Sequence, residues 1–122
     1  IALESAALRK TIERARADDQ VQIALSSILK EMSRLSARPN ALALAQCDLR
    51  FHRQIVRFAD NSILLRTWDD LSHHMLIGFS RDWNRLQNKA GDVALHQRLF
   101  DFILHGNPQD IEAELQKHFT AV

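Results

Sequence analysis

The chain has 122 residues, of which 46% are hydrophobic and 25% charged, with a net charge of +1 and a sequence pI of about 8.2. This balance is typical of one globular domain and excludes a disordered tail, a low-complexity linker and a strongly basic nucleic-acid clamp. A single cysteine excludes an internal disulfide and a cysteine-based zinc site. No apolar run is long enough to span a bilayer, and no signal-peptide pattern opens the chain, so we expect a cytoplasmic protein.

The spacing of apolar residues predicts helices only, because no segment alternates with a period of two. The first helix is expected at about 1–16, the second at 20–36 and the third at 41–59, with a break at 37–40 that contains Pro39. The predicted inward faces are Ile1, Ser5, Leu8, Ile12 and Ala15 in the first helix, Val21, Leu25, Ile28, Met32 and Leu35 in the second, and Leu44, Asp48, Phe51, His52, Ile55 and Ala59 in the third.

The second half of the chain predicts three further helices, at about 62–85, 92–105 and 108–119. Asn61 is a good N-cap for the first of these, a polar loop is expected at 87–91, and Gly106 is expected to stop the helix before it. The predicted inward faces are Leu64, Trp68, Leu71, Met75 and Gly78, then Val93, His96, Phe100 and Ile103, then Ile111, Leu115 and His118. Short loops favour antiparallel neighbours, so we expect an all-α antiparallel bundle of six helices forming one domain over 1–122.

Four polar residues interrupt these apolar faces: Asp48 and His52 one turn apart on the third helix, His96 on the fifth and His118 on the sixth. Burying a carboxylate and three imidazoles is unfavourable unless they are paired or coordinated. Three imidazoles and one carboxylate suit a divalent transition metal, whereas Ca²⁺ and Mg²⁺ prefer oxygen ligands. Taken alone, the Asp48–His52 pair is more often a local hydrogen bond or an exposed pair than a metal site, and a lone inward histidine is more often a satisfied core residue.

Three functions remain open on the residues alone. The first is a sensor domain that binds a metal and a small ligand. The second is a metalloenzyme, which would need an acid or base beside the ligands. We expect no Asp or Glu other than Asp48 on the inward faces near the histidines, since Glu112 and Glu114 lie off the inward stripe. The third is a metal-free interaction module whose four polar residues form a hydrogen-bonded network.

Short patterns around these residues are similar to those of one protein family. Positions 48–52 read Asp-Leu-Arg-Phe-His, and Asn61 follows His52 by nine residues. Positions 95–96 read Leu-His, positions 106–108 read Gly-Asn-Pro before His118, and positions 3–7 read Leu-Glu-Ser-Ala-Ala. Over nearly its whole length the chain resembles the FCD domain, the C-terminal effector-binding domain of FadR-subfamily GntR transcription regulators. It departs from the family pattern at Leu95, where a Glu is usual, and at Asn107, where an Asp is usual.

The resemblance implies a six-helix bundle of the VanR-like branch, with zinc or nickel bound by Asp48, His52, His96 and His118. It also implies that a small carboxylate metabolite completes the metal's ligands. Because the first residue is Ile rather than Met, we expect the chain to be part of a longer protein. The resemblance implies that this protein binds DNA only through a winged-helix domain that precedes the chain. We expect no enzymatic activity and a homodimer, since operators read by helix-turn-helix dimers are two-fold symmetric.

Cationic residues on the fourth helix are candidates to contact the carboxylate. His74 is the first candidate, and Arg81 and Arg85 follow it, although solvated side chains near a helix end are the alternative for the two arginines. We interpret Cys47 as a small core residue. We interpret the aromatic residues Trp68, Phe79 and Trp83 as core or dimer contacts.

Overall fold

The computed structural model describes residues 2–38, 40–85 and 89–120. These residues form six α-helices and one short 3₁₀ turn, with no strand among them. The elements are α1 (Ala2–Ala17), α2 (Gln20–Ser36), α3 (Ala41–Arg57), α4 (Ser62–Arg85), α5 (Lys89–His105), η1 (Pro108–Asp110) and α6 (Ile111–Thr120). The predicted all-α bundle of six helices is therefore confirmed. No helix in the described part is both long and apolar enough to cross a membrane.

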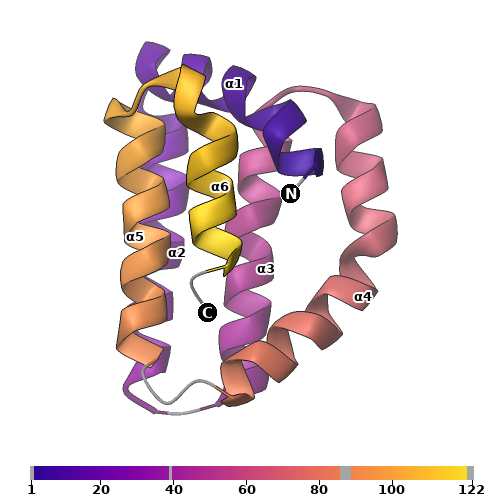
Figure 1. The fold of residues 1–122 in the computed structure, drawn as a ribbon, viewed down its shortest axis with the longest axis vertical. Helices are drawn as coiled ribbons and strands as arrows, with labels where there is room; N and C mark the ends of the chain where they lie inside the picture. Colours follow the sequence, from indigo (N-terminus) through magenta and orange to yellow (C-terminus); the bar gives the residue numbers. More distant parts are fainter. Residues whose placement is uncertain (1, 39, 86–88, 121–122) are drawn as a thin grey trace.

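The helices form a bundle from which α4 stands partly apart (Figure 1). Helices α2, α3, α5 and α6 run alongside one another, while α1 lies across one end and contacts α3, α5 and α6. Helix α4 packs mainly along α3 and curves toward the foot of that helix. Every helix except α4 therefore has several neighbours, and α4 is buried along a single narrow stripe.

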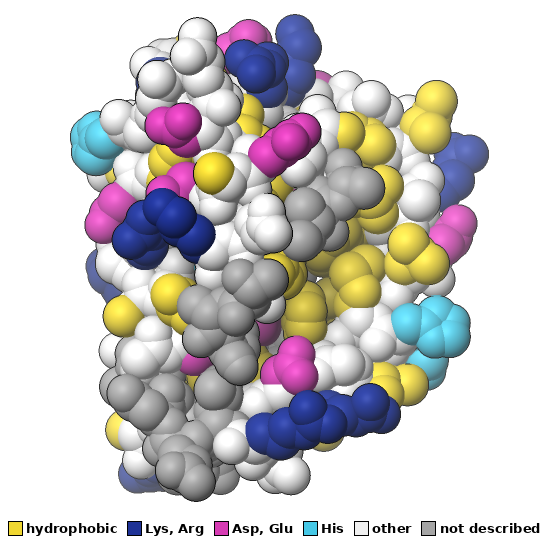
Figure 2. Space-filling view, in the orientation of Figure 1, with side chains coloured by type: hydrophobic (Ala, Val, Ile, Leu, Met, Phe, Trp, Pro, Cys, Tyr) yellow, Lys and Arg dark blue, Asp and Glu magenta, His cyan; other side chains and the backbone are white. Residues whose placement is uncertain are grey.

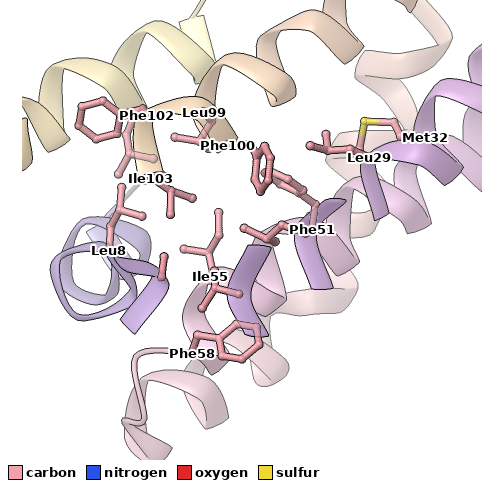
Figure 3. Packing of buried hydrophobic residues seen from close by; sticks show 14 of the residues in the cluster. Leu8, Leu29, Met32, Phe51, Ile55, Phe58, Leu99, Phe100, Phe102 and Ile103 are labelled. Atoms are coloured by element: carbon pink, nitrogen blue, oxygen red, sulfur yellow. The ribbon is translucent and has the colours of Figure 1, made fainter. Parts of the chain in front are cut away.

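Apolar side chains from all six helices contribute to the core of the bundle, and Figure 3 shows part of this core. Leu8 of α1, Ile55 of α3 and Ile103 of α5 meet there and are almost completely buried. Burying one such side chain stabilises the fold by about 1.5–3 kcal/mol. The predicted inward residues of α2 and α3 agree with this core, since each of them is buried or half-buried.

Asparagine side chains define the starts of several helices. Asn61 Oδ1 accepts hydrogen bonds from the backbone N–H groups of Ile63 and Leu64 at 3.1 and 3.2 Å, which confirms the predicted N-cap. Asn40 caps α3 by accepting from the N–H of Ala43 at 3.1 Å. Between α3 and α4, Asp60 has a left-handed φ of 53°, a conformation that a short polar side chain tolerates.

Gly106 follows α5 because of close packing rather than an unusual backbone angle. A Cβ atom built at this position would overlap the ring of Phe102, and no described glycine has a positive φ. The expected helix stop is therefore present at Gly106, but its physical reason is the space that the Phe102 ring occupies.

Several predicted boundaries differ from the structure. Helix α3 ends at Arg57 rather than residue 59, and α5 begins at Lys89, so most of the described part of the predicted 87–91 loop is helical. Pro108 opens a 3₁₀ turn, because Asn107 accepts a hydrogen bond from the N–H of Gln109 at 3.0 Å and holds that turn tight. Ile1, Pro39 and residues 87–88 lie outside the described residues.

One predicted inward position is wrong. Leu71 is 44% exposed, because α4 packs on one side only and its buried stripe passes through Trp68 and Trp83. On α1 Ser5 is half-buried, and its neighbour Glu4 is buried more deeply, at 1% exposure.

Candidate metal centre

The structure brings together the four polar residues that interrupt the apolar faces: Asp48 and His52 of α3, His96 of α5 and His118 of α6. All four side chains are buried. Asp48 Oδ1 lies 2.7 Å from His96 Nε2 and 3.0 Å from His52 Nε2, and His118 Nε2 lies 3.3 Å from His52 Nε2. These four residues are called the His–Asp centre below.

In each imidazole of the His–Asp centre, the Nδ1 atom lies within hydrogen-bond distance of an oxygen acceptor, while Nε2 faces the centre. The three contacts are His52 Nδ1 to Glu4 Oε2 at 2.7 Å, His96 Nδ1 to the Asp92 carbonyl oxygen at 2.8 Å and His118 Nδ1 to the Leu95 carbonyl oxygen at 3.3 Å. Because a carbonyl oxygen only accepts hydrogen bonds, Nδ1 of His96 and His118 carries the proton. The neutral imidazole then presents a lone pair at Nε2, toward the middle of the centre.

The middle of the His–Asp centre is therefore lined with acceptors. A carboxylate oxygen and three Nε2 atoms face one another at 2.7–3.3 Å in a buried space. Lone pairs at such distances repel unless positive charge lies between them. That charge is supplied either by protons on the imidazoles or by a metal cation.

In the metal-free centre, burial and the neighbouring charges shift the pKa values of His52, His118 and Asp48. Burial disfavours the charged form of His52, but the carboxylates of Glu4 and Asp48 outweigh it and raise the pKa of His52 to about 10. Burial and the positive charges of His52 and His96 lower the pKa of His118 to about 3. Burial alone would raise the pKa of Asp48, but the charges and hydrogen bonds of His96 and His52 hold it well below its ordinary value.

Two tryptophans of α4 flank the centre. Trp83 Nε1 donates to Asp48 Oδ2 at 2.9 Å, so the carboxylate turns its other oxygen toward the histidines. The Trp83 ring stacks on His96 at 6.2 Å between centroids, and the Trp68 ring stacks on His52 at 6.3 Å. These contacts fix the orientation of the ligand atoms, as the partners of metal ligands do in general.

The donor set fits a divalent transition metal. Ligand atoms about 2.0–2.2 Å from one ion lie about 3.0–3.4 Å from their neighbours. The His118 Nε2–His52 Nε2 distance of 3.3 Å and the His52 Nε2–Asp48 Oδ1 distance of 3.0 Å fall in that range, and the His96 Nε2–Asp48 Oδ1 distance of 2.7 Å lies just below it. Donor atoms of His52, His96 and His118 all lie within 4.8 Å of one another. Imidazole nitrogens with one carboxylate are ligands suited to zinc or nickel.

Comparison with known proteins gives one match. The family model described as the FCD domain matches residues 1–121. The chain belongs to the FCD domain family. FCD domains are the effector-binding domains of GntR-family regulators, which is a regulatory rather than a catalytic role. No curated protein and no solved structure matched the chain.

Two buried carboxylates of this FCD domain lie beside the ligands and were missed by the reasoning from sequence. Glu4 holds His52, and Asp92 Oδ2 lies 3.9 Å from His96 Nδ1. The signal for Glu4 was its position four residues before Leu8, on the stripe that faces the core. The expectation that no acid other than Asp48 lies near the inward histidines is therefore wrong. Burial raises the pKa of Asp92.

The residues predicted to contact an effector lie on the surface of α4. His74, Arg81 and Arg85 are all exposed, and their role in binding a carboxylate stays a prediction. A groove of about 240 Å³ reaches His118 from the side of α5 and α6 instead. Cys47 is completely buried, in agreement with its interpretation as a core residue.

The metal-free FCD domain is expected to be most stable near pH 6.5. Below that pH the unfolded chain takes up a proton at His118 that the folded domain, with a pKa of about 3, does not. Above it the unfolded chain loses a proton at His52 that the folded domain retains up to a pKa of about 10. After treatment with a chelator, the melting temperature followed by circular dichroism should fall by about 5 °C or more at pH 4.5 and pH 9.

The matched control is His105→Gln, which removes an exposed histidine at the end of α5. This variant should retain the same profile. A melting temperature that rises steadily from pH 6.5 to pH 9 would contradict the direction assigned to His52.

Proposed function

We propose that this FCD domain senses a small carboxylate metabolite by means of a divalent transition metal, zinc or nickel, bound to Asp48, His52, His96 and His118. The domain would be part of a longer cytoplasmic GntR-family regulator of the FadR type. In that protein a winged-helix domain outside this chain would contact DNA, and ligand binding here would alter that contact.

The main support for this proposal is that an oxygen acceptor lies beside the Nδ1 atom of each of the three histidines. Because Glu4 and two backbone carbonyls bind the Nδ1 atoms, the Nε2 atoms of His52 and His96 are directed at Asp48, and Nε2 of His118 is directed at Nε2 of His52. A hydrogen-bonded network needs donors inside the cluster, and these contacts place the donors outside it. In place of protons on the imidazoles, one divalent cation would supply the positive charge that these acceptor atoms need between them.

A metal held by four protein atoms in octahedral coordination retains two positions for the oxygens of water or of a carboxylate. The protein's own residues determine what can reach those positions. Trp83 fixes the Asp48 carboxylate, Glu4 fixes His52, and the aromatic rings of Phe79 and Phe119 pack 5.8 and 5.3 Å from the His52 ring. The bound ligand would therefore be small and enclosed mainly by apolar surface.

The His–Asp centre joins helices that are far apart in sequence, and this offers a route for regulation. Its side chains come from α3, α5 and α6, and the Glu4 contact adds α1, the helix that a preceding DNA-binding domain would adjoin. A ligand that favours one arrangement of these helices shifts the population of arrangements by its difference in affinity.

The metal is tested by elemental analysis of the purified domain and by chelation. We expect one zinc or nickel ion per chain and a lower melting temperature with a chelator, because a ligand bound to the folded state stabilises it. Asp48→Asn and His96→Ala should lose the ion, whereas the exposed control His105→Ala should retain it. A metal-free domain whose melting temperature is unaffected by Zn²⁺ and by chelators would favour the hydrogen-bonded network instead.

The same protein preparations test whether the metal-loaded domain binds small carboxylates. Acetate, malonate and citrate titrated into the Zn²⁺-loaded domain should bind with heat detected by calorimetry, and binding should disappear in Asp48→Asn. Conversion of any of these acids into a product would favour the metalloenzyme, for which Glu4 and Asp92 are the nearest carboxylates.

Glu4 is expected to position His52 for the metal. Glu4→Gln removes the charge of the acceptor at His52 Nδ1 and should weaken Zn²⁺ binding about 10- to 100-fold in a competition titration with a chromophoric chelator. The matched control is Glu13→Gln, which changes an exposed glutamate of the same helix. Equal affinities of the two variants would show that Glu4 has no such role.

We also propose that two copies of the domain pair through the outer face of α4, where Ile63 is 74% and Ile77 is 54% exposed. Exposed apolar residues on one face of one helix are typical of an interface. Ile77→Glu should convert a dimer to a monomer in analytical ultracentrifugation. Ile23→Glu, at a residue of α2 that is 62% exposed, should leave the dimer intact, and a monomeric parent domain would contradict the proposal.

A further inference from the structure

The two tryptophans that flank the His–Asp centre differ in one respect. Both lie on α4 and both are buried, Trp68 at 3% and Trp83 at 1% exposure. The indole N–H of Trp83 donates to Asp48 at 2.9 Å. The indole N–H of Trp68 has no partner, and among the buried side-chain nitrogen and oxygen atoms of the described residues it alone lacks one.

An unpaired buried donor requires an explanation. Leaving such a group without an acceptor destabilises a fold by about 1–3 kcal/mol, and nearly all buried polar side-chain atoms in proteins have a partner. Phe at this position would keep the aromatic ring without that cost. No described group of the chain accepts a hydrogen bond from the Trp68 N–H, so this donor is available to a bound molecule.

The surroundings of Trp68 indicate where that acceptor would lie. Its ring stacks on His52 with 6.3 Å between centroids and 28° between the planes, so the indole adjoins a ligand of the His–Asp centre. Trp68 forms an apolar cluster with the buried residues Ala7, Val56 and Ala59, and five partly buried apolar side chains pack against this cluster: Leu3, Leu49, Leu64, Leu65 and Met75. Figure 2 shows hydrophobic side chains lining a hollow between α6 and α4, the helix that carries Trp68.

We propose that the indole N–H of Trp68 donates a hydrogen bond to a carboxylate oxygen of the bound metabolite. This inference rests on the function proposed above and adds a specificity-determining residue to it. A donor in an apolar wall selects ligands that place an acceptor there, because an ammonium or methyl group at the same place would leave the N–H unpaired. Trp68 is thus more than the core or dimer contact that its sequence position indicated.

Nuclear magnetic resonance tests the proposal directly, because the chain contains only two tryptophans and so gives two indole signals in a ¹H–¹⁵N spectrum. The Trp68→Phe variant assigns them by removing one. Titration of the Zn²⁺-loaded domain with acetate, malonate or citrate should move the Trp68 indole proton downfield, as a new hydrogen bond does. The Trp83 signal, whose donor is already bound to Asp48, should move much less.

Affinity gives a second readout. Trp68→Phe keeps an aromatic ring beside His52 but removes the N–H donor, so it should weaken binding of the same carboxylates roughly tenfold, a larger change than the one it causes in Zn²⁺ affinity. Trp83→Phe is the matched comparison, and it should weaken Zn²⁺ binding because Asp48 loses its orienting donor.

The outcomes separate this inference from the proposed function. If the carboxylates bind to the Zn²⁺-loaded domain, but the Trp68 signal stays in place and Trp68→Phe binds them as tightly as the parent, the inference is wrong and the sensor function stands. A buried water that serves as the acceptor would give that result. If none of the three carboxylates binds at all, both proposals are overturned.

Discussion

The rest of the site depends on one electrostatic constraint, which is that a carboxylate and three imidazole lone pairs meet in a buried space. Asp48 Oδ1 lies 2.7 Å from His96 Nε2 and 3.0 Å from His52 Nε2, distances at which acceptors repel unless a cation separates them. Without a metal, the protonated form of His52 relieves the repulsion, and its raised pKa follows from that. Protons and a divalent ion therefore compete for the same place, so metal binding and pH are linked in this domain.

Much of this arrangement could be predicted from periodicity, because it lies on well-surrounded helices. A residue on the apolar stripe of a helix faces the core whatever its polarity. Four polar residues lie on such stripes: Asp48, His52, His96 and His118. The same rule extends to Glu4, which occupies the stripe position four residues before Leu8. Which nitrogen of His52 it would meet could not be predicted, because that depends on how α1 crosses α3, and spacing within one helix carries no information on crossing geometry.

Helix α4 was harder to predict for a related physical reason. It packs mainly along α3 and curves, so the buried stripe is narrow and its direction along the helix changes. Leu71 falls outside that stripe, while the two tryptophans reach the centre from either end of the helix. The partner of each indole N–H is a tertiary property, and only the packed structure separates the paired donor of Trp83 from the unpaired donor of Trp68.

The His–Asp centre and the two tryptophans of α4 together explain how one small ligand could change the arrangement of several helices. The His–Asp centre links α3, α5 and α6 through its ligands and α1 through Glu4, whereas α4 touches it only through aromatic rings and the Trp83 hydrogen bond. A carboxylate that binds the metal on one side and the Trp68 N–H on the other would connect α4 to the remaining helices. Because α4 packs almost entirely against α3, few contacts determine its position relative to α1, α5 and α6. Helix α4 is thus the element through which ligand binding would change the outer, apolar face of the domain.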